Sequence, residues 1–301
     1  MELAEIGQAQ QERLSHIDFK AFFLGVVGRN DLVNRFGIKE AAATRDIASY
    51  RELAPKNLEY DTKAKAYVIK PSFKPIFEYS PTQVLAALSQ GFGEDFVGTH
   101  KAVVPCEMPA NLNHPLLSVL AVLTRAIHQG KAVRINYRSI ESGQSQRDIV
   151  PFVLVDNGLR WHVRGYCRKR QAFIDFVITR ISDPKLIEGE PQEKEIREAD
   201  IQWNRIVEME IVPHPKLPHP ETIEMDYGMK EGVLKVNVRA AVAGYVLRRW
   251  NVDCTEDHSL EGAEYHLWLR NTPALYGVGN LSIAPNHKKK NNDSNNELIG
   301  K

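Results

Sequence analysis

The chain has 301 residues, of which 43% are hydrophobic and 26% charged, and its formal net charge is +1. This composition is that of a folded protein with room for two or three domains, and it excludes fibrous and fully disordered chains. The longest nearly apolar stretch, residues 116–123, is too short to span a bilayer, and the first residues carry no export signal. Three distant cysteines argue against disulfides and cysteine-based zinc sites. We expect a cytoplasmic protein without membrane contact, metal or cofactor.

The charges are unevenly distributed along the chain. Residues 13–74 contain twelve Lys or Arg and seven Asp or Glu, and residues 131–180 contain ten basic and four acidic residues. Residues 187–231 reverse this balance, with five basic and twelve acidic residues. Two basic segments followed by an acidic one predict two surfaces that meet anions.

Residues 1–96 have the pattern of a winged helix-turn-helix domain. An apolar stripe in residues 12–25 predicts a first helix, and residues 29–37 predict a short second helix ended by glycine. Residues 38–55 predict a third helix that Pro55 closes. Period-two alternation on both sides of a polar tip then predicts a two-stranded wing at residues 58–69, and a further helix follows at 81–96.

The third predicted helix is the candidate DNA reader, since the second helix of a helix-turn-helix enters the major groove. Its exposed N-terminal face is predicted to carry Lys39, Glu40, Ala42, Thr44 and Arg45. Phosphates are expected to be held by Arg29, Lys63 and Lys65. The alternative is an ordinary solvated helix in a protein-interaction domain.

Residues 97–130 are predicted to be a helical linker, with a helix at 114–129 stopped by glycine. From residue 131 a meander of at least four short strands begins, and its Asn157-Gly158 dipeptide is a strong hairpin signal. Short antiparallel strands after a helix predict a small β-barrel over residues 131–190.

The predicted barrel contains a candidate anion pocket. Strand alternation places His162, Arg164 and Tyr166 on one side of their strand. If neighbouring strands converge there, the pocket also includes Tyr137, Ser139, Arg147 and Arg180. Guanidinium donors of this kind suit phosphate or carboxylate. The alternative is that the arginines form ion pairs with Asp148, Asp156 and Asp175.

The remainder is predicted to be an α+β domain at residues 200–286 and a disordered polar tail at 287–301, after a charged linker at 188–202. His214 and His219 lie in a proline-rich stretch and are interpreted as incidental loop residues rather than metal ligands. The chain has no phosphate-binding glycine loop, dinucleotide fingerprint, HExxH or GxSxG motif, so we expect no enzymatic activity.

The barrel segment resembles the WYL-domain transcription regulators. The family's W-Y-L tripeptide corresponds to Trp161-His162-Val163 here, and the matching flanks are Ile135-Asn136-Tyr137, Val150-Pro151 and Thr179-Arg180-Ile181. His162 and Val163 depart from the Tyr and Leu of the tripeptide, which changes the pocket chemistry. The resemblance covers nearly the whole chain and is greatest to the BrxR and CapW type, which represses phage-defence (BREX and CBASS) operons. It implies an α+β multidomain protein with a winged helix, an Sm-like WYL barrel that senses a nucleotide-derived ligand, and a C-terminal dimerisation domain.

The sequence therefore favours a homodimeric repressor that reads an inverted repeat in double-stranded DNA and is released by an anionic ligand. One alternative is a ligand-activated activator of the same architecture. Another is an accessory module whose barrel binds single-stranded nucleic acid, with bases stacked on Trp161, Tyr166 and Phe173.

Overall fold

The computed structural model describes residues 6–90 and 112–286. Residues 97–111 of the predicted linker and the predicted tail lie outside the described residues. Two compact units divide the chain: the first comprises residues 1–154 and 159–196, and the second comprises residues 155–158 and 197–301. Within the described ranges, no helix is both long and apolar enough to cross a membrane.

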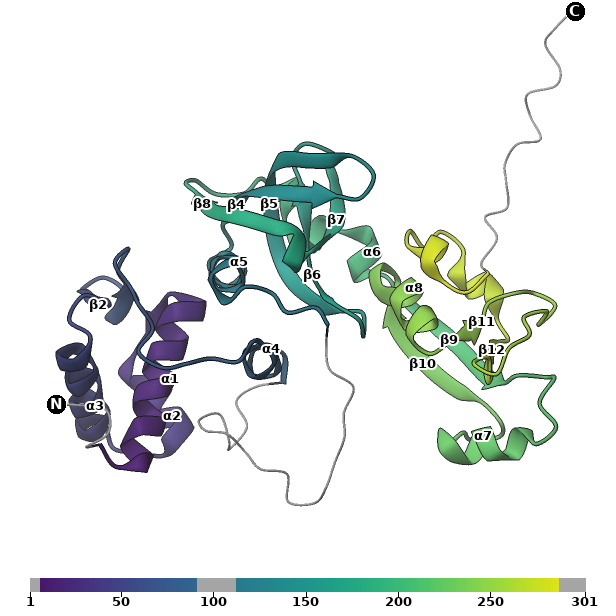
Figure 1. Cartoon of the computed structure of the whole chain (residues 1–301), viewed down its shortest axis with the longest axis horizontal. Coiled ribbons are helices and arrows are strands. Elements are labelled where there is room, and N and C mark those ends of the chain that lie inside the picture. The colour runs from purple at the N-terminus through teal and green to yellow at the C-terminus, as the bar shows by residue number, and fades with distance from the viewer. Residues whose placement is uncertain (1–5, 91–111, 287–301) are drawn as a thin grey trace, which may run out of the picture. The chain divides into compact units, whose positions relative to one another are not determined.

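The first unit begins with a winged helix-turn-helix (Figure 1), as predicted. Its elements are α1 (Gln8–Leu24), β1 (Val26–Val27), α2 (Arg29–Phe36), α3 (Glu40–Leu53), β2 (Leu58–Asp61) and β3 (Ala66–Ile69). Gly37 ends α2 in the left-handed conformation, which turns the chain into α3. The wing has three strands rather than the predicted two, in the order β1-β3-β2, because the short β1 pairs with β3.

The middle of the chain forms an antiparallel five-stranded sheet preceded by two helices, α4 (Pro81–Gln90) and α5 (Leu117–Gln129). The strands are β4 (Ala132–Ser139), β5 (Gly143–Asp156), β6 (Trp161–Cys167), β7 (Ala172–Val177) and β8 (Ile181–Ile187), in the order β7-β6-β5-β4-β8. This order leaves β7 and β8 as edges, so the predicted closed Sm-like barrel is not confirmed. A 3₁₀ turn, Ile178–Arg180, joins the two edges.

The sheet is nevertheless strongly curled. Tyr137 of β4 and Phe176 of β7 belong to strands that are three places apart in the sheet order, yet their rings meet edge to face at 5.0 Å. The N–H of Val177 also donates to the Tyr137 hydroxyl at 3.4 Å. The curl therefore gives the sheet an inner face and an outer face.

One hydrophobic core joins the winged helix to this sheet. It contains Phe19 and Phe23 of α1, the apolar face of α5, and sheet residues that include Val133 and Ile149. Figure 1 shows α5 lying against the five-stranded sheet. A separate core packs the other face of α1, with Leu14 and Ile17, against α2 and α3. Helix α1 thus takes part in both cores.

The second unit is α+β, as predicted, and contains a four-stranded sheet in the order β10-β9-β12-β11. Its elements are α6 (Ile201–Asn204), β9 (Ile206–Pro213), α7 (Pro220–Asp226), β10 (Leu234–Arg239), α8 (Ala240–Arg249), β11 (Val252–Asp253) and β12 (Leu267–Leu269). Its core gathers apolar residues from the sheet, α7 and α8. The sequence missed β9 and α7, because prolines between them resemble a loop.

Candidate nucleic-acid interface and ligand site

Helix α3 presents one outward stripe of small, polar and basic side chains. Its inner face buries Ala43, Asp46, Ile47 and Tyr50. Most of the predicted contacts are exposed: Lys39 just before the helix, and Glu40, Thr44 and Arg45 on it. Ala42 is only half-buried rather than fully exposed, and the exposed small residues of the stripe are Ala41 and Ala48. A stripe of this composition permits close approach to base edges.

The start of α3 carries two local interactions. The Thr44 hydroxyl donates to the Glu40 carbonyl at 2.9 Å, so it is left with acceptor capacity for a partner. Arg29, at the start of α2, lies 3.9 Å from the Glu40 carboxylate, and both side chains are exposed. The two helices therefore bring Arg29 and Glu40 to the same end of the outward stripe.

The wing is held beside α3 by an arginine that the sequence interpretation overlooked. The guanidinium of Arg51 lies 5.5 Å from the centre of the Tyr67 ring on β3, and Tyr60 packs 5.1 Å from the same ring. The wing tip is an exposed turn in which Asp61 accepts the N–H groups of Lys63 and Ala64. Helix α3 and the wing therefore form one surface.

The position of α3 is fixed by polar contacts to α1. Arg13 of α1 pairs with the buried Asp46 of α3 at 2.6 Å. Tyr50 donates to Asp18, which also accepts the Tyr79 hydroxyl at 2.7 Å. Burial raises the pKa of Asp18, against the opposing effect of these hydrogen bonds. Buried polar groups of this kind specify one packing arrangement, because each needs its partner in place.

The predicted anion pocket is divided between the two faces of the curled sheet. Register pairs Ile135 with Arg147 and Tyr137 with Ser145, so these four side chains share the inner face. Val163 of β6 belongs to the same inner core. Its neighbours along the strand, His162 and Arg164, therefore point to the outer face. Tyr137 and Arg147 do not converge with His162 and Arg164.

On the outer face the arginines have carboxylate partners. Arg164 pairs with Asp175 at 2.8 Å, with side-chain exposures of 7% and 11%. Arg134 forms two hydrogen bonds with Asp148, which lower the pKa of that carboxyl. Arg164 therefore forms an ion pair, as the alternative interpretation predicted. His162, beside Arg164, is buried.

On the inner face, in contrast, Arg147 has no carboxylate partner among the described residues. Arg147 is 7% exposed, and it forms no ion pair with any residue that the structure describes. The Ser145 hydroxyl, two residues away on the same face, is buried without a hydrogen-bond partner. None of the Arg147 nitrogens is fully buried, so a guanidinium without a carboxylate partner is accessible here and could pair with an anion.

The other predicted pocket residues lie elsewhere. The Ser139 hydroxyl accepts the N–H groups of Glu141 and Ser142 and shapes the β4–β5 turn. Arg180 lies half-buried in the 3₁₀ turn and does not end a strand. Tyr166 is 6% exposed, and its ring packs edge to face against Phe173 at 5.2 Å. These two rings are occupied with each other, which disfavours the single-strand stacking alternative.

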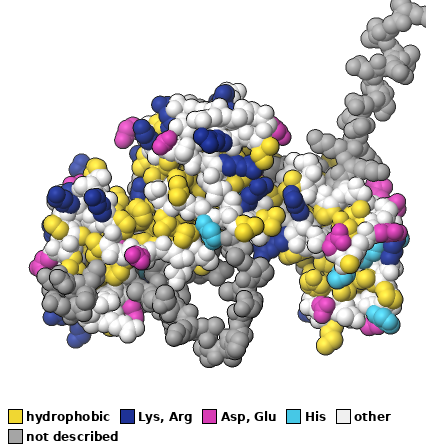
Figure 2. Space-filling view, in the orientation of Figure 1, with side chains coloured by type: hydrophobic (Ala, Val, Ile, Leu, Met, Phe, Trp, Pro, Cys, Tyr) yellow, Lys and Arg dark blue, Asp and Glu magenta, His cyan; other side chains and the backbone are white. Residues whose placement is uncertain are grey.

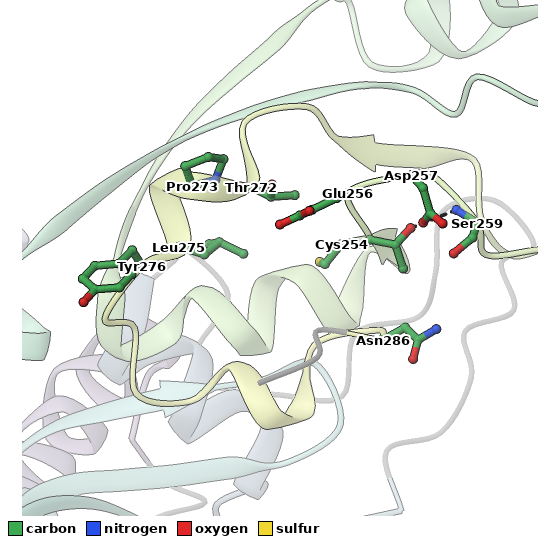
Figure 3. Close-up of a pocket in the computed structure, with 10 residues that line it drawn as sticks. Cys254, Glu256, Asp257, Ser259, Thr272, Pro273, Leu275, Tyr276 and Asn286 are labelled. Atoms are coloured by element: carbon green, nitrogen blue, oxygen red, sulfur yellow. Dashed lines mark hydrogen bonds between the residues drawn. The ribbon is translucent and has the colours of Figure 1, made fainter. Parts of the chain in front are cut away.

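The second unit has an open cavity of about 610 Å³ (Figure 3), which none of the predicted site residues lines. Its wall includes Glu256 and Asp257, beside Thr255 and Ser259. An acidic lining of this kind repels phosphate and carboxylate. The cavity therefore does not replace the predicted anion pocket.

His214 is not an incidental loop residue, in contrast to the prediction. It is 2% exposed, and its Nε2 lies 3.2 Å from Asp253. The N–H of Lys216 approaches its Nδ1 at 3.3 Å, which leaves Nε2 as the donor to Asp253. His219 is exposed and pairs with Glu221. Among the described residues, no group of three or more His, Cys, Asp or Glu is arranged to hold a metal ion.

Basic side chains gather over the five-stranded sheet in the face shown in Figure 2. The second unit instead shows several acidic and histidine side chains in that view. The picture agrees with the charge distribution along the sequence, in which residues 131–180 carry a basic excess and residues 187–231 an acidic one.

Three family models match the chain. The BrxR transcriptional regulator winged helix-turn-helix domain matches residues 9–90, and the WYL domain matches residues 118–186. The BrxR transcriptional regulator C-terminal dimerization domain matches residues 206–275. The three matches follow one another in the order in which the structure places the winged helix, the five-stranded sheet and the α+β unit.

The chain is also similar to curated proteins over most of its length. The DNA-binding transcriptional repressor CapW of Escherichia coli (strain KTE188) is 31% identical over 280 residues, or 89% of this chain and 91% of that protein. CapW of Pseudomonas aeruginosa is 34% identical over 257 residues, or 81% and 83%. CapW of Stenotrophomonas maltophilia is 33% identical over 271 residues, or 83% and 86%. These relatives are regulators and not members of an enzyme class. The chain therefore belongs to the family of WYL-domain transcriptional regulators that includes BrxR and CapW.

Proposed function

We propose that this protein is a cytoplasmic, homodimeric transcriptional repressor that binds double-stranded DNA through α3 and its wing. The observation that carries the proposal is the single surface formed by the outward stripe of α3 and the wing, which the Arg51–Tyr67 contact joins. Arg45 on α3 reaches bases or phosphates, and Lys63 and Lys65 on the wing tip hold phosphates. CapW relatives that align with 81% and 89% of this chain are named DNA-binding transcriptional repressors.

Dimerisation follows from the C-terminal unit, which matches a family dimerization domain. A twofold dimer carries two winged helices, and these suit the two halves of an inverted repeat. We propose that the repressed genes are the protein's own phage-defence operon, as the resemblance in sequence to the BrxR and CapW type implies. Repression is lifted when a ligand favours a dimer geometry that does not span both half-sites.

The ligand is an anion, and Arg147 is its principal partner. Arg147 is buried without an ion pair to a described residue, and Ser145 and Tyr137 supply hydroxyls on the same face of the sheet. Arg164 is already neutralised by Asp175, so it supports the sheet and does not bind the ligand in this proposal. A phosphate or an oligonucleotide fragment has the charge and the acceptors that this face lacks.

A reporter gene under the chain's own upstream region tests the repressor assignment. We expect deletion of the gene to raise expression and the intact gene to restore repression. Arg45→Ala is expected to leave the reporter active although the protein accumulates normally. The matched control is Arg138→Ala, which removes an exposed arginine of β4. A reporter that falls when the gene is deleted identifies an activator and overturns the proposed sign of regulation.

The ligand site is tested by thermal unfolding with inorganic pyrophosphate and with oligonucleotides of two to four nucleotides. A ligand that binds only the folded state raises Tm with concentration. We expect this rise in the wild type and in Arg138→Met, and we expect Arg147→Met to abolish it. A rise that persists in Arg147→Met places the anion elsewhere.

A further inference from the structure

Side chains of α5 form hydrogen bonds to the C-terminal end of α1. The Thr124 hydroxyl donates to the Phe23 carbonyl at 2.7 Å, and the Arg125 guanidinium donates to the Phe22 carbonyl at 2.5 Å. The last carbonyls of a helix have no partner within it, and α1 has no basic residue of its own in its last turn. Helix α5 therefore supplies the cationic cap that α1 lacks.

A third contact lies at the same place. Gly25 ends α1 with a φ of 83°, and a Cβ built on it would come within 2.7 Å of the Gln129 amide and 3.3 Å of the Arg125 side chain. A larger residue there would displace the Gln129 amide and would also have to adopt a left-handed backbone conformation, which favours glycine. We call the four residues Phe22–Gly25 and their contacts to α5 the α1–α5 joint.

The joint continues directly into the wing. The Gly25 carbonyl accepts the N–H of Ile69 at 3.0 Å, and the next two residues form β1. Strand β1 pairs with β3, with Val26 opposite Val68 and Val27 opposite Tyr67. A displacement of the joint therefore also displaces β3. This strand carries Tyr67, whose ring packs against Arg51 of α3.

The other end of this path lies in the five-stranded sheet. Helix α5 packs in one core with Ile135 and Ile149, which flank Arg147 on the inner face. It also runs into β4, since the N–H of Lys131 donates to the Ala126 carbonyl at 2.9 Å. A closely packed core transmits small shifts because it does not deform continuously.

We propose that Thr124 and Arg125 are positioning residues for DNA binding, and that α5 sets the position of the wing through the α1–α5 joint. Ligand binding to the five-stranded sheet then changes how strongly the wing binds phosphates. Helix α3 stays in place through the Arg13–Asp46 ion pair and the Tyr50–Asp18 hydrogen bond. The proposal rests on the proposed function in that the wing contacts DNA. It specifies the wing, rather than the recognition helix, as the element that moves.

A double-mutant cycle tests which element the joint controls. The probe is a labelled duplex of the upstream region, titrated by fluorescence anisotropy with the full-length dimer. We expect Arg125→Met to weaken binding and to make the plot of log K against log salt less steep by about 3.6, because the dimer has four wing lysines and each lost phosphate contact removes about 0.9 from the slope. In a chain that already carries Lys63→Ala and Lys65→Ala, Arg125→Met is expected to change neither quantity further. Combined with Arg45→Ala, it is expected to add its full effect.

The reverse pattern overturns the proposal. If Arg125→Met adds its full effect to the wing-lysine variant and has no further effect in Arg45→Ala, the joint acts on α3 rather than on the wing. If neither the wing lysines nor Arg45 affects binding, the proposed DNA interface itself fails, which is a distinguishable result. Arg138→Met, which removes an exposed arginine from the sheet, is the matched control and is expected to leave the slope unchanged.

A second measurement covers the case in which Arg125→Met does not fold. Thr124→Val keeps the side-chain shape and replaces the hydroxyl with a methyl group, which cannot donate to the Phe23 carbonyl. Hydrogen exchange of the full-length protein is expected to show faster exchange of the Ile69 amide, which bonds the joint, at unchanged rates in α3. Equal acceleration in both elements, or none in either, contradicts the proposal.

Discussion

Tyr50 of α3 donates a hydrogen bond to Asp18 of α1, and neither side chain is exposed. The same phenol accepts the Asn57 amide at 3.0 Å, and Asn57 in turn holds the backbone of Lys74 where the wing returns. One buried hydrogen-bond network therefore connects α1, α3 and the segment that follows β3. Burial and the nearby Asp18 charge also raise the pKa of Tyr50, so the phenol remains a donor.

Removal of the Tyr50 hydroxyl is expected to destabilise the winged helix. Tyr50→Phe leaves the buried Asp18 without one of its donors, and a hydrogen bond to a charged group contributes about 1.5–3 kcal/mol. We expect urea unfolding to show a loss of free energy of that order. Tyr60→Phe removes a hydroxyl from a ring that is 50% exposed, and it should be nearly neutral. Equal losses of unfolding free energy in both variants would show that the hydrogen bond to Asp18 stabilises the protein no more than an exposed hydroxyl does.

The Arg164–Asp175 and Arg134–Asp148 ion pairs are expected to differ in how much they stabilise the folded protein. Asp175→Ala removes the carboxylate that pairs with the buried Arg164, and loss of one partner of a buried pair costs about 3–5 kcal/mol. Asp148→Ala breaks the pair with Arg134, whose side chain is 51% exposed, and solvent screening leaves such a pair a much smaller contribution to stability. Chemical denaturation of the two variants measures the difference. Similar losses would contradict the assignment of Arg164 as a structural residue.

Stability is expected to fall in mild acid because of His16. Burial, together with the charges of Arg35 and Lys20, lowers the pKa of His16 from 6.5 to about 3. Below pH 6.5 the unfolded chain binds a proton that the folded chain does not take up until about pH 3. The stability that neutral His16 contributes is therefore present above pH 6.5 and is lost at about 1.4 kcal/mol per pH unit below it.

His16→Gln isolates this contribution. Between pH 7 and pH 5 we expect the wild type to lose about 2 kcal/mol more of its unfolding free energy than the variant does. Carboxyl groups that titrate over the same range, including Asp18 with its raised pKa, are common to both proteins and cancel in the comparison. Parallel stability curves for the two proteins would show that His16 is solvated in the folded state.

The wing lysines are expected to act through charge alone. Lys63→Ala combined with Lys65→Ala should weaken binding to every duplex equally and make the salt dependence less steep by about 3.6, since four lysines are lost from the dimer. Arg45→Ala should instead reduce the preference for the upstream region over a shuffled duplex. Anisotropy titrations at several salt concentrations separate the two behaviours. A loss of sequence preference in the lysine variant would mean that the wing reads bases.

Local sequence signals predicted the elements of the winged helix well. Gly37 after α2 and Gly130 after α5 both adopt the left-handed conformation that favours glycine. Strand β1 was missed because two residues carry no periodicity, and only their pairing with β3 makes them a strand. Helix α7 was missed because Pro220 suggested a loop, although proline is well suited to the first turn of a helix.

The predicted anion pocket shows where sequence reasoning stops. Alternation within β6 placed His162 and Arg164 on one side correctly, since that depends on one strand alone. Whether Arg147 of β5 joins them depends on register and on the curl of the sheet, which single strands do not encode. The buried partner Asp46 was invisible for the same reason, because an acidic residue is predicted to be exposed unless its cation is known to lie beside it. Asp175 was anticipated only as one of three carboxylates in the ion-pair alternative, and the structure pairs it with Arg164.

The most direct test of the central claim is a titration of the purified protein on its own upstream region and on a shuffled duplex, at about 0.15 M salt, with the stoichiometry of the complex measured. Salt must be fixed because phosphate contacts make affinity depend steeply on it. The account predicts specific, nanomolar binding of one dimer to an inverted repeat. Equal and weak binding to both duplexes, or binding of a single chain to one half-site, would contradict it.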